Sequence, residues 1–198
     1  MIYFNNENLT PATDCVVIKI TDSDILASQS SGFVISEESL RNMRVGFAQV
    51  LKIGKEAKEK TGLVEGSWVY YDKLSTFYHT EPVAVLRYNG LIMETNAEKT
   101  KYRALEGRVI VQEFKEKEES KSLFVIPTAK EMKVGIIKSI TPPYDGKEIP
   151  FSVGDKILLT KDECDELNGF TGDKDLDPTL PIYIYKTENI ICKINEDN

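Results

Sequence analysis

The sequence has little of what most enzyme and metal sites are built from. Among 198 residues there is one histidine, one tryptophan and three cysteines. No cysteine or second histidine stands near His79, so the chain offers no zinc-ligand spacing and no base beside a nucleophile. We therefore predict no catalytic residue, no metal and no cofactor.

The cysteines do not form the pattern of a disulfide framework. Cys15, Cys164 and Cys192 are odd in number and widely spaced. Cys15 and Cys192 lie in apolar runs typical of β-strands, where a thiol behaves as a small hydrophobic group. We interpret them as structural residues.

Charge and hydropathy exclude two further classes of protein. No apolar run approaches the roughly 20 residues that cross a bilayer, so we predict no membrane span. The formal charge of −7 argues against a nucleic-acid binder, which needs a basic face. The first residues have the character of neither a secretory signal nor a transit peptide, and we expect a cytoplasmic location.

What the sequence does have is an internal plan that occurs twice, over residues 15–95 and 108–195. Each copy has an apolar strand, a polar loop, an apolar triplet, a Val-Gly β-run, a turn-rich excursion closing on glycine, another strand, and a proline-led strand pair. In the same order, the first copy places these at 16–19, 20–32, 33–35, 45–51, 54–66, 67–71 and 81–94. The second places them at 109–112, 113–123, 124–126, 134–140, 141–154, 155–159 and 180–193.

The strands are short, rich in Val, Ile, Tyr and Phe, and separated by polar or glycine turns, which predicts an all-β fold of barrel type. We expect two domains, residues 1–95 and 105–198, joined by a linker at 96–104. The second copy also has an insertion at 161–179. Its Asp173, Asp175 and Asp177 suggest calcium, but Pro178 stands where an EF-hand has glycine, and we favour an acidic surface loop.

Each copy resembles a chaperonin-10 domain of the GroES family. In the first copy the resemblance rests on SGFVIS, VGFAQVLKIG, VEGSWVYYDK and EPVAVLRYNGLIM. In the second it rests on LEGRVIV, SLFVIPTAK, VGIIKSI, SVGDKILL and ENIICKI. The strings most similar to the family are Phe124-Val125-Ile126-Pro127 and residues 152–157.

This resemblance implies two tandem GroES-like irregular β-barrels and a non-enzymatic function. It implies a co-chaperonin that caps an ATP-driven, GroEL-type chaperonin, assists protein folding and assembles as a homo-oligomeric ring. The chaperonin would be bound by the apolar triplets on the two mobile loops: Phe33, Val34, Ile35, Phe124, Val125 and Ile126. Residues 54–66 and 141–154 would correspond to the hairpin at the roof of the family's dome.

Two alternatives stay open. The GroES-like fold could be reused as a structural protein, a phage virion ring or capsid accessory in the host cytoplasm, with the triplets serving as strand or subunit contacts. An enzyme with a GroES-like domain is disfavoured, because such enzymes need a glycine-rich nucleotide-binding turn that this sequence lacks. Ser75, Tyr78 and His79 lie close in sequence but have no placed carboxylate to complete a triad.

Overall fold

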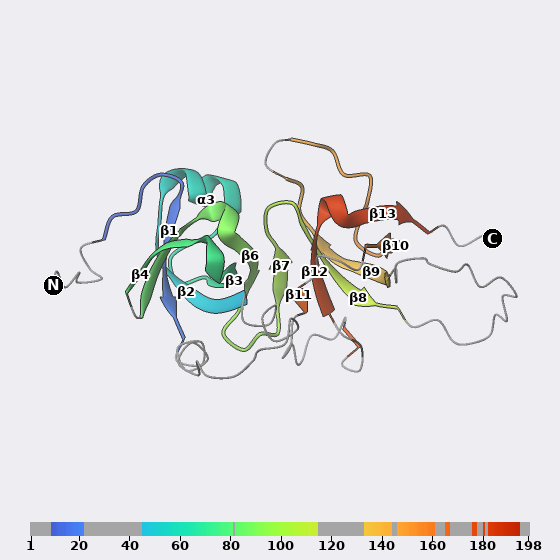
Figure 1. Cartoon of the computed structure of the whole chain (residues 1–198), viewed down its shortest axis with the longest axis horizontal. Coiled ribbons are helices and arrows are strands. Elements are labelled where there is room, and N and C mark those ends of the chain that lie inside the picture. Colours follow the sequence, from blue (N-terminus) through green and yellow to red (C-terminus); the bar gives the residue numbers. More distant parts are fainter. Residues whose placement is uncertain are drawn as a thin grey trace, which may run out of the picture. The chain divides into compact units, whose positions relative to one another are not determined.

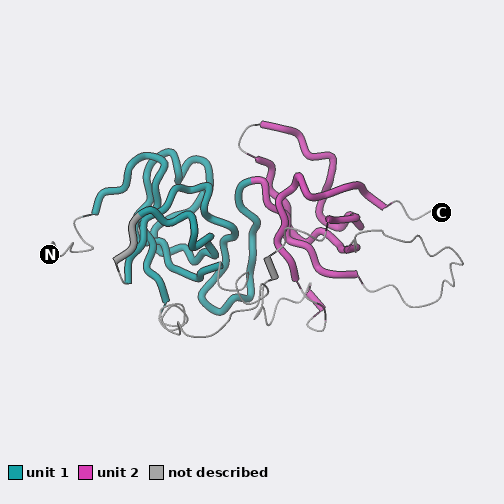
Figure 2. Tube along the Cα trace, in the orientation of Figure 1, with its two compact units in different colours: residues 1–106 teal, residues 107–198 magenta. Residues whose placement is uncertain are grey.

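A computed structural model describes residues 9–21, 45–80, 82–114, 133–143, 146–160, 165–166, 176–177, 180 and 182–194, excluding the side chains of 78–80 and 165–166. The chain forms two compact units, residues 1–106 and 107–198, and each is described by itself (Figure 2). In the described ranges no helix has the length and apolar character of a membrane span.

The first unit is built on one antiparallel sheet of seven strands (Figure 1). Its hydrogen-bonded order is β4-β5-β1-β2-β3-β6-β7. The strands are β1 (Cys15–Ile20), β2 (Val45–Ile53), β3 (Trp68–Asp72), β4 (Thr76–Thr80), β5 (Val83–Arg87), β6 (Leu91–Thr95) and β7 (Tyr102–Ala104). Short 3-10 turns, Lys73–Ser75 and Tyr88–Gly90, precede β4 and β6.

Alternate side chains of these strands point to one face of the sheet and form the core of the first unit. Val16 and Ile18 of β1 face the same side as Ala48 and Val50 of β2, and all four are at most 1% exposed. The ring of Tyr71, 2% exposed, fills the space beside Gly46. At roughly 1.5 to 3 kcal/mol for each buried large apolar side chain, this alternating face is the main source of stability.

One helix, α3 (Lys55–Thr61), lies in the excursion that the resemblance assigned to a roof hairpin. Its residues are mostly Lys, Glu and Ala, which favour helix, and it ends before Gly62. Ala57 and Thr61 are buried, and the Thr61 hydroxyl donates to the Ala57 carbonyl at 2.6 Å. The excursion therefore contributes side chains to the core.

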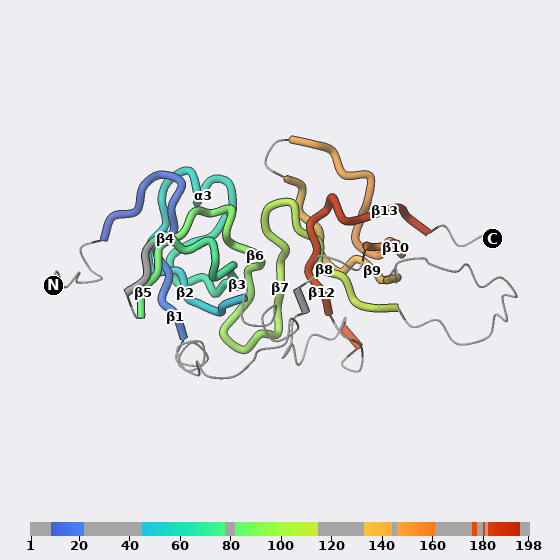
Figure 3. The backbone as a smooth tube through the Cα atoms, viewed as in Figure 1, coloured from blue at the N-terminus to red at the C-terminus, as the bar shows by residue number. Residues whose placement is uncertain are grey.

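The second unit has six strands in the order β11-β12-β8-β9-β10-β13. The strands are β8 (Arg108–Glu113), β9 (Lys133–Ile140), β10 (Lys156–Leu159), β11 (Asp165–Glu166), β12 (Ile182–Lys186) and β13 (Ile190–Lys193). A 3-10 turn, Thr187–Asn189, precedes β13. Figure 3 follows the backbone through each unit in turn.

The pairing pattern of the first sheet recurs in the second. Both sheets have a register shift between the second and third rungs of the first strand pair: Val17/Ile18 against β2, and Ile110/Val111 against β9. A further shift occurs at Tyr70/Tyr71 and at Leu158/Leu159. The second core accordingly uses the corresponding positions: Val109, Val111, Ile137, Ile157, Leu159, Tyr183 and Tyr185.

The turns that enter β3 and β10 are also alike. Gly66 (φ 91°) and Gly154 (φ 93°) adopt the left-handed conformation that suits glycine. In each case the side chain of the residue after this glycine accepts a hydrogen bond from a backbone N–H three residues earlier. The Val64 N–H donates to the Ser67 hydroxyl at 3.2 Å, and the Ser152 N–H donates to Asp155 Oδ2 at 2.9 Å.

Equivalent strands at the ends of the two sheets differ in exposure. In the first unit β7 pairs with β6, and Ile92 and Met93 are at most 1% exposed. In the second unit β13 ends the pairing order of the described strands, where Ile191 is 47% exposed and Cys192 is exposed as well. Both cysteines lie on strands, as their apolar runs predicted, but Cys15 is buried whereas Cys192 is exposed.

The all-β prediction is confirmed. The described strands form two antiparallel sheets, each with two end strands in its pairing order, and their pairings close no barrel. Within the expected linker, residues 96–104, the strand β7 belongs to the first sheet. The division into domains at 1–95 and 105–198 stays a prediction, and most of the insertion at 161–179 lies outside the described residues.

The ion pair at the start of β10 gives a test by pH. Asp155 Oδ1 lies 2.6 Å from Lys193 Nζ, and this bond, with the Ser152 N–H, holds the pKa of the Asp155 carboxyl below its ordinary 3.8. A lowered pKa stabilises the folded state above the unfolded-state value, and this stabilisation is lost as pH falls through the folded-state pKa.

We expect Asp155→Asn to lower the free energy of unfolding by about 1 kcal/mol at pH 7 and by less near pH 3. Urea unfolding at both pH values measures the difference. Glu188→Gln, which removes the exposed pair with Lys186, is the control and should change little. An Asp155→Asn deficit that is equal at both pH values would contradict the role of the charge.

Candidate functional site

The two predicted mobile loops are each held between neighbouring antiparallel strands. In the first unit the chain leaves β1 at Ile20 and re-enters the sheet at Val45. The last rung of this pair joins Ile20 to Ala48, and the Thr21 hydroxyl donates to the Phe47 carbonyl at 3.3 Å. On the other side of β1, the Ile20 N–H donates to the Pro82 carbonyl at 2.8 Å. Three chain segments thus fix the point of departure, which we call the first loop stem.

The second loop stem has the same backbone arrangement. Glu113, the last residue of β8, pairs with Gly135, and the Phe114 N–H donates to the Val134 carbonyl at 2.9 Å. Counted from the register shift, Glu113 and Ile20 occupy the same rung of their strand pairs. Both loops are therefore held at the same position in their own sheet.

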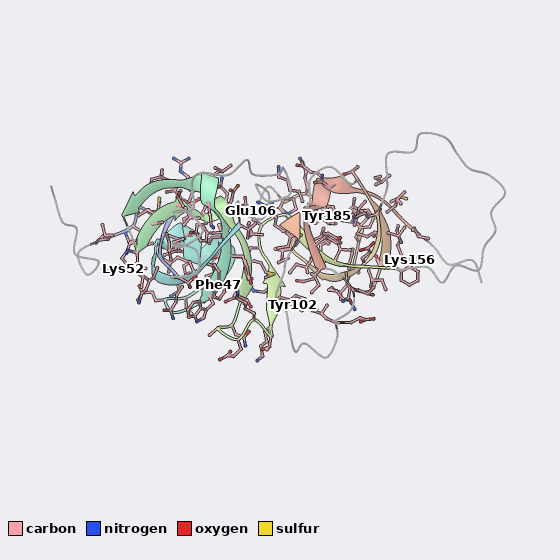
Figure 4. The ribbon with its side chains drawn as sticks, turned by 60° about the horizontal axis from the view of Figure 1, so that its bottom comes forward. Phe47, Lys52, Tyr102, Glu106, Lys156 and Tyr185 are labelled. Atoms are coloured by element: carbon pink, nitrogen blue, oxygen red, sulfur yellow. The ribbon has the colours of Figure 1, made fainter. Side chains whose placement is uncertain are left out.

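The side chains around the stems differ. At the second stem, Lys156 Nζ lies 4.0 Å from the Phe114 ring centroid and Lys133 Nζ lies 3.6 Å from that of Tyr183. Such cation–π contacts contribute about 0.5 to 1 kcal/mol at exposed sites. In the first unit Trp68 occupies the strand position that Lys156 has in the second. Lys156 is labelled in Figure 4.

An aromatic cluster lies beside the first stem. The Phe47 ring stacks on Trp68 at 5.0 Å, and Tyr70 approaches it at 5.1 Å. Lys99 Nζ lies over Phe47 at 4.5 Å. We did not predict this cluster, although alternate residues of β3 carry Trp68 and Tyr70 on one face and so provided a signal.

The glycines near the stems correct one part of the predicted repeat. Val45-Gly46 and Val134-Gly135 were matched as one landmark, but the register puts Gly135 at the position of Ala48. The two glycines also serve different neighbours. A Cβ at Gly46 would strike the Tyr71 ring, whereas one at Gly135 would strike Val111 and the Gln112 carbonyl.

The predicted chaperonin-binding residues lie outside the described residues. This applies to Phe33, Val34, Ile35, Phe124, Val125 and Ile126, whose role stays a prediction. Of the predicted loops 20–32 and 113–123, the structure describes only the stem residues Ile20, Thr21, Glu113 and Phe114. Ile20 and Glu113 are strand residues, so each loop begins at least one residue later than predicted.

The acidic insertion is attached next to the second stem. Gln112 is 4% exposed; its amide N–H donates to the Asp177 carbonyl at 2.8 Å, and its amide oxygen accepts from the Asp177 N–H at 3.1 Å. Asp173 and Asp175 lie outside the described residues. In the described ranges no three or more His, Cys, Asp and Glu side chains gather as metal ligands. Nothing in the sequence marked Gln112 for this contact.

The thiol of Cys15 is not an activated nucleophile. Burial, followed by a hydrogen bond to Asp14 and that residue's charge, raises the pKa of the Cys15 thiol to about 11. The thiol is therefore protonated at neutral pH and unreactive. Ser75 ends a 3-10 turn, and the side chains of Tyr78 and His79 lie outside the described residues.

Comparison with known families finds one similarity, over the second half of the chain. Residues 101–194 match the family model of the chaperonin 10 Kd subunit. The match takes in β7 and all described strands of the second sheet, and it supports at most a GroES-like, co-chaperonin kind of function. Members of that family are co-chaperonins and not enzymes. No curated protein matches the chain.

The packing of the second stem can be tested at Gly135. We expect Gly135→Ala to destabilise the protein by about 1 to 3 kcal/mol, because the added methyl group overpacks against Val111. Val111→Ala removes the struck methyl group, so the double variant should be less destabilised than the sum of the two single changes. Denaturant unfolding of all four proteins measures this, and strict additivity would exclude the contact.

The state of Cys15 can be tested in a C164S/C192S background, where it is the single thiol. Alkylation at pH 8 should be at least about a hundredfold slower in the native protein than in denaturant, because a pKa near 11 leaves few thiolates. Equal rates in the two states would contradict the burial of Cys15.

Proposed function

We propose that the chain is a co-chaperonin with two GroES-like units in tandem, each presenting one loop to a GroEL-type chaperonin. The observation that supports this most directly is the equivalence of the two loop stems. The family match covers the second unit, and the first unit has the same strand order, register shifts and turn into its third strand.

The apolar triplets are the parts of the loops that fit a protein partner. Burying side chains such as Phe, Val and Ile stabilises a complex by roughly 1.5 to 3 kcal/mol each. Fixing about ten loop residues in one conformation costs roughly 1 to 2 kcal/mol apiece. A single loop would therefore bind weakly and reversibly.

Several loops held in one assembly bind more tightly than one. After the first has docked, the others engage at high effective concentration, and avidity adds factors of about 10² to 10⁴. We propose a homo-oligomeric ring for this reason, and the exposed end strand β13 offers an edge for subunit contact. Assembly also makes affinity sensitive to the loss of either loop.

The triplets can be tested by substitution. We expect Phe33→Asp and Phe124→Asp each to weaken nucleotide-dependent binding to a GroEL-type chaperonin by about ten- to a hundredfold, the value of one buried Phe. The double variant should not bind detectably. Co-sedimentation with the chaperonin, with and without ATP, measures binding, and refolding of a chaperonin-dependent substrate measures function.

Phe77→Asp is the matched control, because Phe77 lies on β4, outside the β1/β2 pair from which the first loop leaves, and is 62% exposed. It should bind as the parent does. A double Phe33/Phe124 variant that binds and assists refolding like the parent would overturn the assignment of the triplets, and loss of binding in only one single variant would show that one loop acts alone.

A further inference from the structure

Each end of the second predicted loop has a lysine placed over an aromatic ring. Phe114, the first residue after β8, has its ring centroid 4.0 Å from Lys156 Nζ. Lys133, the first residue of β9, places its own Nζ 3.6 Å from the ring centroid of Tyr183. Residues 115–132, which join these two ends, lie outside the described residues. The last described residue before the loop and the first one after it are thus both held by their side chains.

Both pairs connect the loop to a strand outside the β8/β9 pair. Lys156 belongs to β10, so its side chain reaches across β9 to Phe114 at the end of β8. Lys133 begins β9, and its side chain reaches across β8 to Tyr183 of β12. Tyr183 packs in the core of the second unit, whereas Lys156 precedes the core residue Ile157 on its strand and so lies on the other face. The two pairs therefore hold the ends of the loop on opposite faces of the sheet.

The first loop cannot form either pair, because the equivalent residues lack the side chains. Counted along the strand pairs from the register shift, Thr21 takes the place of Phe114, and Gly46 takes that of Lys133. Threonine has no ring to lie under a cation, and glycine has no side chain. The Tyr71 ring fills the space beside Gly46. The two stems are thus equivalent in backbone and unequal in side-chain contacts.

The first unit has a cation–π contact of its own, but that contact lies within the sheet. Lys99 Nζ lies 4.5 Å from the ring centroid of Phe47 and 5.7 Å from that of Tyr70. Phe47 and Tyr70 are paired residues of the neighbouring strands β2 and β3. Thr21, at the end of the loop, reaches this cluster through its hydroxyl bond to the Phe47 carbonyl and not through a ring. The lysine of the first unit therefore holds two strands together and not an end of the loop.

We propose that Lys133 and Lys156 are positioning residues for the second loop and that, through them, the second loop binds a chaperonin more tightly than the first. The proposal rests on the proposed function in one respect, namely that both loops dock on a chaperonin. Docking costs conformational entropy for each loop residue that becomes fixed. Contacts that already hold the ends of the loop in the free protein lower this cost, and such preorganisation raises affinity.

The contact at Phe114 is tested in the full chain without a partner. The Phe114 N–H donates to the Val134 carbonyl at 2.9 Å, so its exchange with solvent deuterium requires the end of β8 to open. Lys156→Gln should speed this exchange about two- to fivefold, the range of an exposed cation–π contact. The Ile20 N–H, which donates to the Pro82 carbonyl in the first unit, is the internal control and should keep its rate. Unchanged exchange at Phe114 would overturn the proposal.

Two further variants show whether Lys156 acts through the ring. Lys156→Arg keeps a cation over Phe114 and should exchange like the parent. In a Phe114→Leu background the ring is gone, so Lys156→Gln should no longer change exchange at residue 114. An effect of the same size in both backgrounds would mean that Lys156 acts through another neighbour, and the positioning role would be wrong.

The inequality of the loops is tested by binding to a GroEL-type chaperonin with ATP. Phe124→Asp should weaken binding at least about twofold more than Phe33→Asp does, the value of one cation–π contact. Equal losses, or a greater loss with Phe33→Asp, would contradict the proposal.

The two lysines are then changed with one loop disabled at a time. In a Phe33→Asp background, where the second loop alone binds, Lys133→Gln and Lys156→Gln should each weaken binding about two- to fivefold. In a Phe124→Asp background neither change should have an effect. Lys138→Gln, which removes a lysine from the interior of β9, is the matched control and should change binding in neither background. Equal effects of Lys133→Gln and Lys156→Gln in the two backgrounds would show a general role in the fold and overturn the proposal.

The two measurements separate this proposal from the proposed function. If the parent binds a chaperonin but the lysine variants leave the contribution of the second loop unchanged, the positioning role is wrong and the proposed function stands. If Lys156→Gln speeds exchange at Phe114 but the parent binds no chaperonin with ATP, the held loop end stands, and the proposed function is overturned together with the unequal binding.

Discussion

The structure depends on one interaction in each unit: the antiparallel pairing of the strands on either side of a predicted loop. β1 with β2 and β8 with β9 share a register shift near one end and an uninterrupted set of rungs toward the loop. The shift increases local twist, and the rungs beyond it hold the two ends of each loop at strand spacing. The positions of both loops follow from this pairing.

Much of the fold could be predicted from the sequence, because the period-2 alternation of Val, Ile and Tyr marks strands and core together. The spacing of the final strand pair was also informative: Leu91 and Ile190 take equivalent places, each after a 3-10 turn. The match of Gly46 with Gly135 failed because glycine is required wherever a neighbouring side chain approaches the backbone closely, and this happens at different rungs in the two sheets. Gly46 accommodates a ring, and Gly135 accommodates an aliphatic side chain.

Other features could not be predicted, because they depend on contacts between distant segments. A seven-residue helix is too short to show a clear period, yet α3 buries Ala57. Cys192 lies in an apolar run like that of Met93, but its exposure depends on whether another strand lies beside it. The triplets were recognised by their likeness between the two copies. The described stems fix where each loop leaves its sheet and where it re-enters.

Residues 101–106 fall within the family match of the second half of the chain but belong to the first compact unit. By family likeness they open the second half of the chain, and by contact they complete the first, where β7 closes off Met93 and Arg103 reaches α3. A cut placed where the family match begins would remove β7 from the first sheet and leave β6 without its pairing partner on that side. A boundary after Glu106 would instead leave each sheet with all of its described strands.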